Sequence, residues 1–349
     1  MSCTSLFLRK TLMLSLCLIL QPSLIHADPI SEQERCLLRQ LEQASPTTRV
    51  GELRDRCTKT AKPLPPEPGL ADEASSTEAD EELPSVTDGE ISLVEQRINA
   101  ELETRSNPFV LSPHKQNYLL LASYNDTPNY EIYNEPASDF DRLEMKFQLS
   151  FKMPVVEGLF GTRSDLYAAY TNLSFWQAYN RDISSPFRET VHEPEMFLVV
   201  PNSWQFQGWR NALMRFGVVH QSNGQGGYLS RSWNRVYANF IFEKRNFLLG
   251  IKPWYRIPED NDDNPDIDDY LGRYELTGLY KRGDQTFSLL LRNLFDGDRR
   301  DTLQLDWSFP LHGRWRGYFQ YFRGYGESLI DYNAKSHRLG FGLQLTDWL

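Results

Sequence analysis

A serine and a histidine stand two residues apart in the stretch Val218-Val-His220-Gln-Ser222-Asn-Gly224, and an asparagine follows at Asn234. A serine hydroxyl is a weak nucleophile until a neighbouring base takes its proton, and His220 is suited to be that base. A third group must fix the imidazole tautomer, and the neutral oxygen of Asn234 can accept its N–H. Gly224 lets the backbone approach a tetrahedral oxyanion closely. These residue types are the ones that catalysis by an activated serine requires.

The His-x-Ser spacing arises by chance in many chains, so the alternative is a rim histidine among polar loop residues. Successive side chains of a strand alternate between two faces, which places His220 and Ser222 with Phe216 and Val218. By the same alternation, the apolar residues that share a face with Asn234 are Val236, Ala238, Phe240 and Phe242. These neighbours mark a lipid-facing surface, where polar groups cost free energy. Three polar side chains gathered there indicate a use for them.

From Pro113 onward, hydrophobic residues recur at every second position, which is typical of strands with two different faces. Twelve segments of this kind lie near residues 115–124, 142–153, 163–176, 192–203, 211–220, 230–242, 246–255, 271–281, 285–293, 301–309, 314–323 and 336–348. The pattern predicts an all-β fold, a 12-stranded antiparallel transmembrane β-barrel with a small N-terminal periplasmic extension, part helical and part disordered.

The last segment shows the two faces most clearly. One side carries Leu339, Phe341, Leu343 and Leu345; the other carries Arg338, Gly340, Gly342, Gln344 and Thr346. An apolar outside and a polar inside reverse the arrangement of a small soluble barrel. The long links are 125–141, 177–191, 221–229, 256–270, 294–300 and 324–335, and the others are short turns. Long loops are extracellular in outer-membrane barrels, so Ser222, which opens one of them, is expected at that end.

The N-terminus predicts secretion. Residues 1–27 have a basic start, a short apolar run and a small residue, Ala27, at the expected cleavage point of a signal peptide. Residues 61–90 are rich in Pro, Glu, Asp and Ser, which is typical of an acidic linker. A short amphipathic helix over 91–104 then opens a barrel domain that we place at 91–349.

Residues 28–60 carry helical spacing and the cysteines Cys36 and Cys57. An oxidising compartment favours a disulfide between them, which closes a small helical hairpin. Metal binding by the two cysteines is the alternative, but structural zinc needs about four protein ligands.

Composition excludes several classes of protein. No segment after the signal approaches the roughly 18 apolar residues of a spanning helix, and mean hydropathy is −0.52. The aromatic content of 13% suits the interfacial girdles of a barrel. The net charge of −10 comes partly from the acidic linker. No basic face interleaved with aromatics is present, so nucleic acid binding is not expected.

Five stretches of the chain occur in a specific order. They are Ser184-Ser-Pro-Phe-Arg-Glu189, His220-x-Ser222-Asn-Gly224, Ser230-Arg-Ser-Trp-Asn234-Arg235, Lys252-Pro-Trp-Tyr255 and Gly324-Tyr-Gly-Glu-Ser-Leu-Ile-Asp-Tyr-Asn333. They closely resemble outer-membrane phospholipase A of Gram-negative bacteria, and the likeness covers roughly residues 109–349. The resemblance implies an enzyme that hydrolyses sn-1 and sn-2 acyl esters of phospholipids and lysophospholipids at the extracellular leaflet. It makes Ser222 the nucleophile, His220 the base and Asn234 its orienter, with the Gly224 amide in the oxyanion hole.

The same resemblance implies Ca²⁺ and a second subunit. It implies an inactive monomer and an active homodimer that binds one Ca²⁺ per monomer at its interface. The Ser230 hydroxyl and the Gln225 carbonyl hold the ion, and Ser184 reaches it from the other subunit. Asn172 corresponds to a glutamine that forms a hydrogen bond across the family's dimer interface.

This chain departs from the family pattern at three positions. Gly227 stands where the family has an acidic residue that binds calcium in the monomer, and Gln225 stands where it tends to have arginine. Asn172 is a shorter amide than the family's glutamine. A second acidic calcium position is kept as Asp263.

Three other interpretations stay open at this stage. A passive pore or structural barrel would use the polar inner face, and a barrel protease would place acidic catalytic residues in the loops. The acidic stretch 260–269 lacks the glycine and glutamate of an EF-hand, so a solvated loop is the alternative to a calcium site there.

Overall fold

The computed structural model describes residues 92–105, 111–130, 132–133, 140–159, 162–295, 297, 299–313 and 315–346. The predicted signal peptide, the 28–60 hairpin with its Cys36–Cys57 disulfide and the 61–90 linker lie outside these residues.

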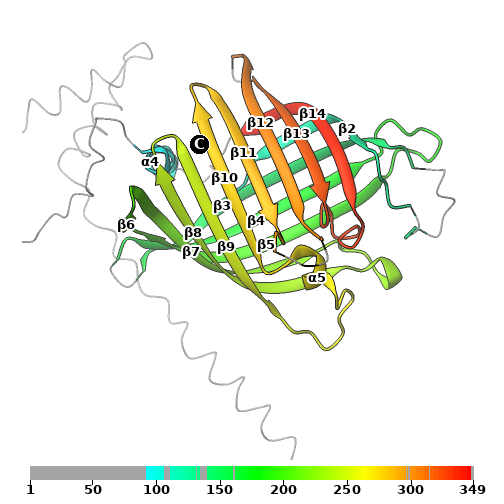
Figure 1. Cartoon of the computed structure of the whole chain (residues 1–349), viewed down its shortest axis with the longest axis horizontal. Helices are drawn as coiled ribbons and strands as arrows, with labels where there is room; N and C mark the ends of the chain where they lie inside the picture. The colour runs from blue at the N-terminus through cyan, green and yellow to red at the C-terminus, as the bar shows by residue number, and fades with distance from the viewer. Residues whose placement is uncertain are drawn as a thin grey trace, which may run out of the picture. The chain divides into compact units, whose positions relative to one another are not determined.

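Twelve long antiparallel strands in the described part of the chain form one closed sheet (Figure 1). They are β2 (Asn117–Asn125), β3 (Leu143–Leu159), β4 (Ser164–Trp176), β5 (Phe187–Pro201), β7 (Trp209–Ser222), β8 (Ser232–Lys244), β9 (Phe247–Ile257), β10 (Tyr274–Arg282), β11 (Gln285–Arg292), β12 (Thr302–His312), β13 (Trp315–Gly324) and β14 (Ser336–Thr346). Pairing of β2 with β14 closes the ring. Two short strands, β1 (Ser112–Pro113) and β6 (Gln205–Phe206), pair with β3 and β7. The predicted 12-stranded antiparallel barrel is confirmed.

Three strands, β3, β5 and β7, exceed their predicted lengths by the most. Strand β3 continues past Pro154, and a register shift between Pro154 and Val156 accommodates the proline. Strand β5 begins at Phe187 rather than near 192, because polar Glu189, which resembled a loop residue, is buried and accepts a hydrogen bond from the Ile330 amide at 3.1 Å. Strand β7 runs to Ser222, which therefore ends a strand instead of opening a loop.

The helices lie at opposite ends of the barrel. Helix α4 (Leu93–Arg105) confirms the helix predicted near 91–104. The one-turn helices η1 (Gly227–Leu229) and α5 (Ile267–Leu271) lie in segments predicted as loops. Among the helices that the structure describes, none is long and apolar enough to cross a membrane.

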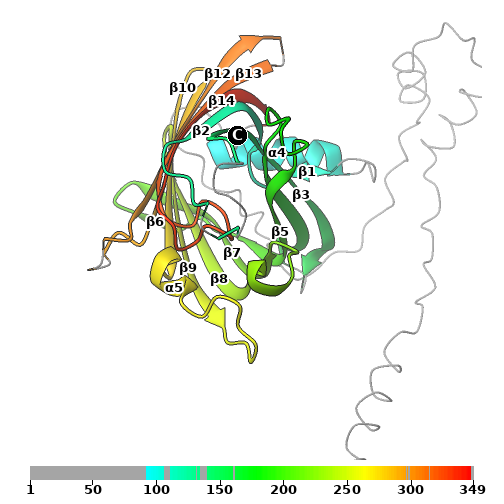
Figure 2. The same ribbon diagram turned by 90° about the vertical axis from the view of Figure 1, so that its right-hand side faces the viewer.

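Helix α4 lies inside the ring of strands, at the end where the turns are short (Figure 2). Its apolar contacts are with strands β7 to β10: Leu93 and Val94 pack in one buried cluster with Ala212, Leu213, Ile241, Leu248 and Leu279. The carboxylate of Glu101 binds the Lys152 ammonium of β3 at 2.7 Å. The helix therefore connects both sides of the barrel interior, which we call the lumen.

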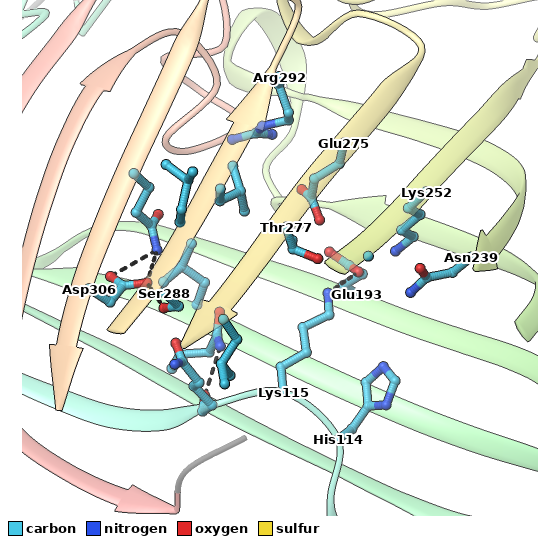
Figure 3. A pocket seen from close by; sticks show the side chains of 18 of the residues that line it. His114, Lys115, Glu193, Asn239, Lys252, Glu275, Thr277, Ser288, Arg292 and Asp306 are labelled. Carbon is cyan, nitrogen blue, oxygen red and sulfur yellow. Dashed lines mark hydrogen bonds and ion pairs between the residues drawn. The ribbon is translucent and has the colours of Figure 1, made fainter. Parts of the chain in front are cut away.

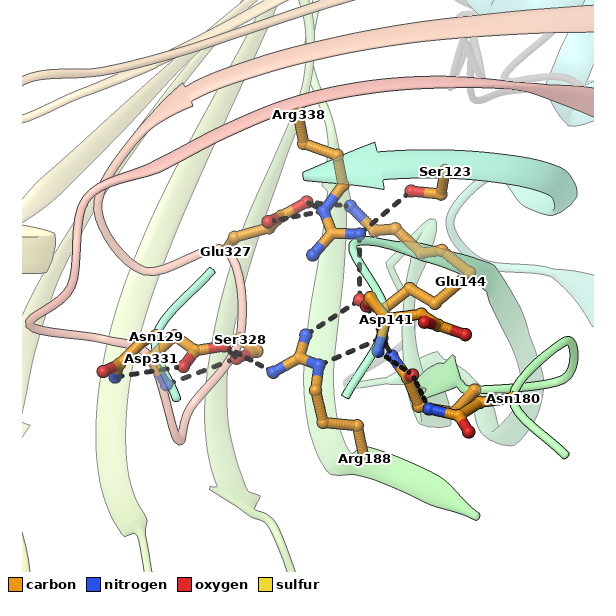
Figure 4. A network of polar contacts seen from close by, with 12 residues as sticks. Ser123, Asn129, Asp141, Glu144, Asn180, Arg188, Glu327, Ser328, Asp331 and Arg338 are labelled. Carbon is orange, nitrogen blue, oxygen red and sulfur yellow. Dashed lines mark hydrogen bonds and ion pairs between the residues drawn. The ribbon is translucent and has the colours of Figure 1, made fainter. Parts of the chain in front are cut away.

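A charged network crosses the lumen near the long-loop end (Figure 4). Glu144 binds Arg188 at 3.0 Å and Arg338 at 2.8 Å. Arg338 also binds Glu327 at 2.8 Å, and Glu327 binds the Lys146 ammonium at 3.0 Å. All five side chains are at least nine-tenths buried. Because each charge has an opposite partner, the network ties β3, β5 and β14 to the 325–335 loop.

Glu327→Ala tests this network. The substitution leaves Arg338 and Lys146 without their shared carboxylate, and losing one partner of a buried ion pair costs about 3–5 kcal/mol. We expect the free energy of unfolding to fall by about 3 kcal/mol in urea titrations followed by tryptophan fluorescence. Asp182→Ala, at an exposed loop position, should leave it unchanged. Equal stability of the two variants would contradict the role of the network.

The same carboxylate makes stability depend on pH. Burial raises the pKa of Glu327, but Arg338 and Lys146 outweigh that effect and lower it from 4.5 to about 2. A lowered folded-state pKa stabilises the protein above the unfolded value, and the gain disappears as pH falls from 4.5 towards 2. Wild type should therefore lose its stability advantage over the alanine variant across that range. A constant difference would contradict this.

Candidate active site

The register between β7 and β8 brings the predicted catalytic residues together. His220 lies directly opposite Asn234, and Ser222 lies opposite Ser232. The exposure of neighbouring residues identifies the face: Val218 is 51% exposed, whereas Val219 is 3% exposed. Since alternate residues share a face, His220 and Ser222 lie on the outer surface with Val218. The strands therefore place both side chains on the outer, lipid side, as the sequence predicted.

His220 and Asn234 form a hydrogen bond. The Nδ1 atom of His220 lies 2.8 Å from Oδ1 of Asn234, so the imidazole N–H donates to the amide oxygen. Within the described residues, the Ser222 hydroxyl makes no hydrogen bond with this imidazole, although the two side chains leave the same strand face. Catalytic hydrogen bonds are often long in the free enzyme and tighten when substrate binds. The pair can therefore serve a serine nucleophile.

Glu259 is a further member of this group that the sequence did not reveal. The Nδ2 atom of Asn234 donates to Oε1 of Glu259 at 3.0 Å. Glu259 lies two residues beyond Ile257, the end of β9, and Ile257 is directly opposite Asn234. The register between β8 and β9 is the signal that would have identified it.

The loop after Ser222 turns sharply at Gly224. Its φ of +65° lies in the left-handed region, which glycine adopts without strain. A Cβ atom there would lie 3.7 Å from Cδ2 and 3.8 Å from Nε2 of His192. His192, on β5, is directly opposite Ser222, and its Nδ1 lies 2.6 Å from the Tyr170 hydroxyl. The sequence prediction missed this second histidine beside the Gly224 turn.

Two of the four predicted calcium ligands are in contact. The Ser230 hydroxyl donates to Oδ2 of Asp263 at 2.6 Å, although 33 residues separate them. Asn223 fixes the loop from both sides, because its Oδ1 accepts from the backbone N–H groups of Gln225 and Arg231 at 3.3 and 3.0 Å. A hydroxyl beside a carboxylate presents hard oxygen atoms, which suit Ca²⁺.

The loop that carries Asp263 is anchored in the barrel. Ile267 and Leu271 of α5 are buried in one cluster with Trp233 and Trp254. The Oδ1 atom of Asn264 accepts the Ser232 amide at 3.0 Å. These contacts hold the β9–β10 loop against the end of β8.

The structure does not bring the two predicted inter-subunit residues into this group. Ser184 lies in the β4–β5 link with a φ of +63°. Asn172 lies on β4, where its Oδ1 accepts the Ser174 hydroxyl at 3.0 Å. Within the described part of one chain, no hydrogen bond joins either residue to Ser222, Ser230 or Asp263.

An apolar surface borders the site. Phe216 of β7 and Phe240 of β8 form an edge-to-face pair with ring centroids 6.3 Å apart. Phe216 is 42% exposed, and Val218 lies between it and His220 on the same strand face. A hydrocarbon chain lying along this surface would end at Ser222.

Most of the chain is similar to known proteins. Residues 94–345 match the phospholipase A1 family. Phospholipase A1 of Escherichia coli strain K12 is 40% identical over 247 residues, which cover 70% of this chain and 85% of that protein. Phospholipase A1 of Klebsiella pneumoniae is 40% identical over 247 residues, which cover 70% and 86%.

Two solved structures are similar to the barrel. The outer membrane phospholipase A of Escherichia coli superposes with a TM-score of 0.68 at 39% identity, covering 72% of this chain and 98% of that one. The Salmonella typhi outer membrane phospholipase, a dimer with bound calcium, has a TM-score of 0.66 at 39% identity, covering 69% and 94%.

Asn234→Ala tests the pairing with His220. Without the amide oxygen, the Nδ1–H tautomer loses its acceptor, and we expect its share of the neutral imidazole to fall. Nitrogen NMR of histidine-labelled protein in micelles measures this, with the His220 signal assigned by substitution. Asn234→Asp retains an acceptor and should retain the tautomer. An unchanged signal in the alanine variant would show that Asn234 does not set it.

Proposed function

Because the chain belongs to the phospholipase A1 family and is an outer-membrane β-barrel phospholipase, we propose that Ser222, His220 and Asn234 form its catalytic centre. The observation that carries the proposal is the hydrogen bond between His220 and Asn234, formed beside Ser222 on the outer apolar face. Polar side chains on that face are costly unless they have a use. The centre lies at the long-loop end, which faces the extracellular leaflet in an outer-membrane barrel.

In the proposed reaction, Nε2 of His220 takes the hydroxyl proton of Ser222 as the Ser222 oxygen attacks the acyl carbonyl carbon. Asn234 holds the ring and accepts its Nδ1–H throughout. The Gly224 amide donates to the oxyanion that forms. The imidazolium then returns its proton to the leaving lysophospholipid oxygen, and an acyl-serine remains. Water then gives a proton to His220 and attacks the acyl-serine ester, the proton returns to the Ser222 oxygen, and the fatty acid is released.

The substrates of this reaction are phospholipids and lysophospholipids, cleaved at sn-1 or sn-2 esters. The acyl chain lies along Phe216, Val218 and Phe240, whose side chains lead to the serine. A surface that contacts only hydrocarbon does not distinguish the two acyl positions.

We further propose that the enzyme requires calcium and acts as a homodimer. The Ser230 hydroxyl and the Gln225 carbonyl hold one Ca²⁺ per monomer, Ser184 of the second copy completes the site, and Asp263 adds a carboxylate to it. The contact between Ser230 and Asp263 supports this donor set. When bound, the ion supplies positive charge beside the oxyanion. The similar Salmonella typhi structure, a dimer with bound calcium, supports the assembly. The proposal places Asn172 at the dimer interface.

A passive pore is the alternative function, and the lumen argues against it. Helix α4 crosses one end and the charged network crosses the other. A cavity of about 260 Å³ lies between them, and charged side chains such as Lys252, Glu275 and Arg292 line it together with uncharged ones (Figure 3). Within it, Lys115 binds Glu193 at 2.5 Å. A lumen crossed by paired charges does not form an open channel.

Ser222→Ala tests the catalytic proposal. Without the nucleophile, release of fatty acid from mixed phospholipid–detergent micelles with calcium should fall by on the order of 10⁴-fold or more. A folded protein with wild-type heat stability is the control for misfolding. If the alanine variant retained wild-type release, Ser222 would not be the nucleophile and the proposed centre would be wrong.

Asp263→Asn tests the calcium site. The substitution removes a charged oxygen ligand, so the calcium concentration for half-maximal release should rise about tenfold, equivalent to about 1.4 kcal/mol. Asp260→Asn removes a charge from the same loop without that contact and should leave the concentration within about twofold. Activity that persists in chelator would contradict the calcium requirement itself.

A further inference from the structure

The Asn234 amide lies between an imidazole and a carboxylate. Its Oδ1 faces Nδ1 of His220 at 2.8 Å, and its Nδ2 faces Oε1 of Glu259 at 3.0 Å. Asn234 and Glu259 are half-buried, whereas His220 is exposed. Three side chains from β7, β8 and the segment after β9 thus form one chain of hydrogen bonds on the outer face.

This order of contacts determines which way the amide points. An ionised carboxylate only accepts hydrogen bonds, so Glu259 must face the NH₂ end of Asn234. The oxygen end then faces His220, and that oxygen can only accept. The proton of the neutral imidazole must therefore be on Nδ1, which leaves Nε2 unprotonated and turned away from Asn234. A base needs this tautomer to take the serine proton.

Without Glu259, the amide has no such preference. A rotation of half a turn would present the NH₂ group to Nδ1, stabilise the opposite tautomer and place the ring proton on Nε2. Oxygen and nitrogen of an amide differ little in size, so packing alone does not prevent the rotation. The Glu259 carboxylate prevents the rotation, because it can only accept a hydrogen bond and therefore needs the NH₂ group of Asn234.

Glu259 also supplies the charge that an asparagine lacks. In a Ser-His-Asp triad, the carboxylate next to the imidazole stabilises the imidazolium of the transition state. Here the carboxylate is one amide further away, so its field favours the imidazolium in the same direction but less strongly.

The backbone that carries Glu259 is held in place. Pro258 fixes the φ angle just before it. The Arg256 guanidinium donates to the carbonyl groups of Pro265 and Asn264 at 3.0 and 3.1 Å and binds the Asp262 carboxylate at 2.5 Å. These bonds fold the 258–265 segment back onto β9, so the loop that carries the Glu259 carboxylate is held in place.

We propose that Glu259 is a positioning residue that extends Ser222, His220 and Asn234 into a chain of four, by orienting the Asn234 amide and adding a negative charge behind it. The inference rests on the proposed function and deepens it. Neither the sequence comparison nor the spacing of the motifs assigns this role to Glu259.

Two substitutions separate orientation from charge. Glu259→Gln retains an oxygen that can accept from Asn234 but removes the charge, and Glu259→Ala removes both. At saturating calcium, we expect kcat for fatty acid release to fall about three- to tenfold in the glutamine variant and about 10- to 100-fold in the alanine variant. KM should change less than twofold, since Glu259 does not contact the lipid. Asp260→Asn, which removes the neighbouring charge, should retain wild-type kcat.

The pH profile distinguishes positioning from general loosening of the structure. Other titratable or charged groups near this end of the strands are Tyr170 on β4, His192 on β5, and Arg256, Asp260, Asp262 and Asp263 at the end of β9 and in the β9–β10 link. All of them stay in both variants. Removing the Glu259 charge disfavours the imidazolium, so the acid limb of the kcat profile should move to lower pH in both variants. A merely destabilised site would lose rate without moving that limb.

The outcomes separate this inference from the proposed function. If wild type and both Glu259 variants release fatty acid with the same kcat and pH profile while Ser222→Ala is inactive, the role of Glu259 is wrong and the catalytic proposal stands. If the wild-type protein itself releases no fatty acid, the catalytic proposal fails. The His220 tautomer then still tests Glu259, since Glu259→Ala should reduce the Nδ1–H share seen by nitrogen NMR. An unchanged share overturns the positioning role.

Discussion

A chain that crosses hydrocarbon as strands has no water to satisfy its backbone, so every N–H and C=O within the bilayer must find a partner in the chain. Only a closed ring meets this requirement, and the pairing of β14 with β2 closes it here. Closure then separates two environments. Side chains that alternate along each strand face either lipid or the lumen, and the lumen must be filled by groups that satisfy one another. The buried contacts of Glu144, Arg338 and Glu327 are the result.

The same constraint gives the proposed catalytic group its position. On a surface where polar atoms are costly, the hydrogen bonds of His220, Asn234 and Glu259 satisfy one another. Each comes from a different strand or strand end, so the site exists only when neighbouring strands are in register. The loops add precision, because Asn223 and the buried residues of α5 hold the turns on either side. A rigid wall thus carries a site that is open to lipid.

Period-two alternation was sufficient to predict the twelve strands, the polar lumen and the outward placement of His220 and Ser222. It was not sufficient for contacts between strands, because these depend on register. The pairing of β8 with β9 brings Glu259 to Asn234, and the pairing of β5 with β7 brings His192 to Ser222; nothing in the local pattern marks either register. For that reason Glu259 and His192 escaped notice, although each lies near a residue that the motif had identified. Helix α5 escaped for a different reason, since five residues are too few to show a helical period.

Helix α4 has a mechanical consequence. A hollow cylinder flattens easily when it is pressed from one side, because its wall can bend without stretching. Helix α4 contacts β3 through Glu101 and the β7–β10 wall through Leu93 and Val94, so it spans the cross-section as a strut. Any flattening must break an ion pair on one side or expose apolar surface on the other. The barrel therefore resists a change in diameter when a force acts on its outer face. The strands that carry His220 and Asn234 keep their curvature as a result.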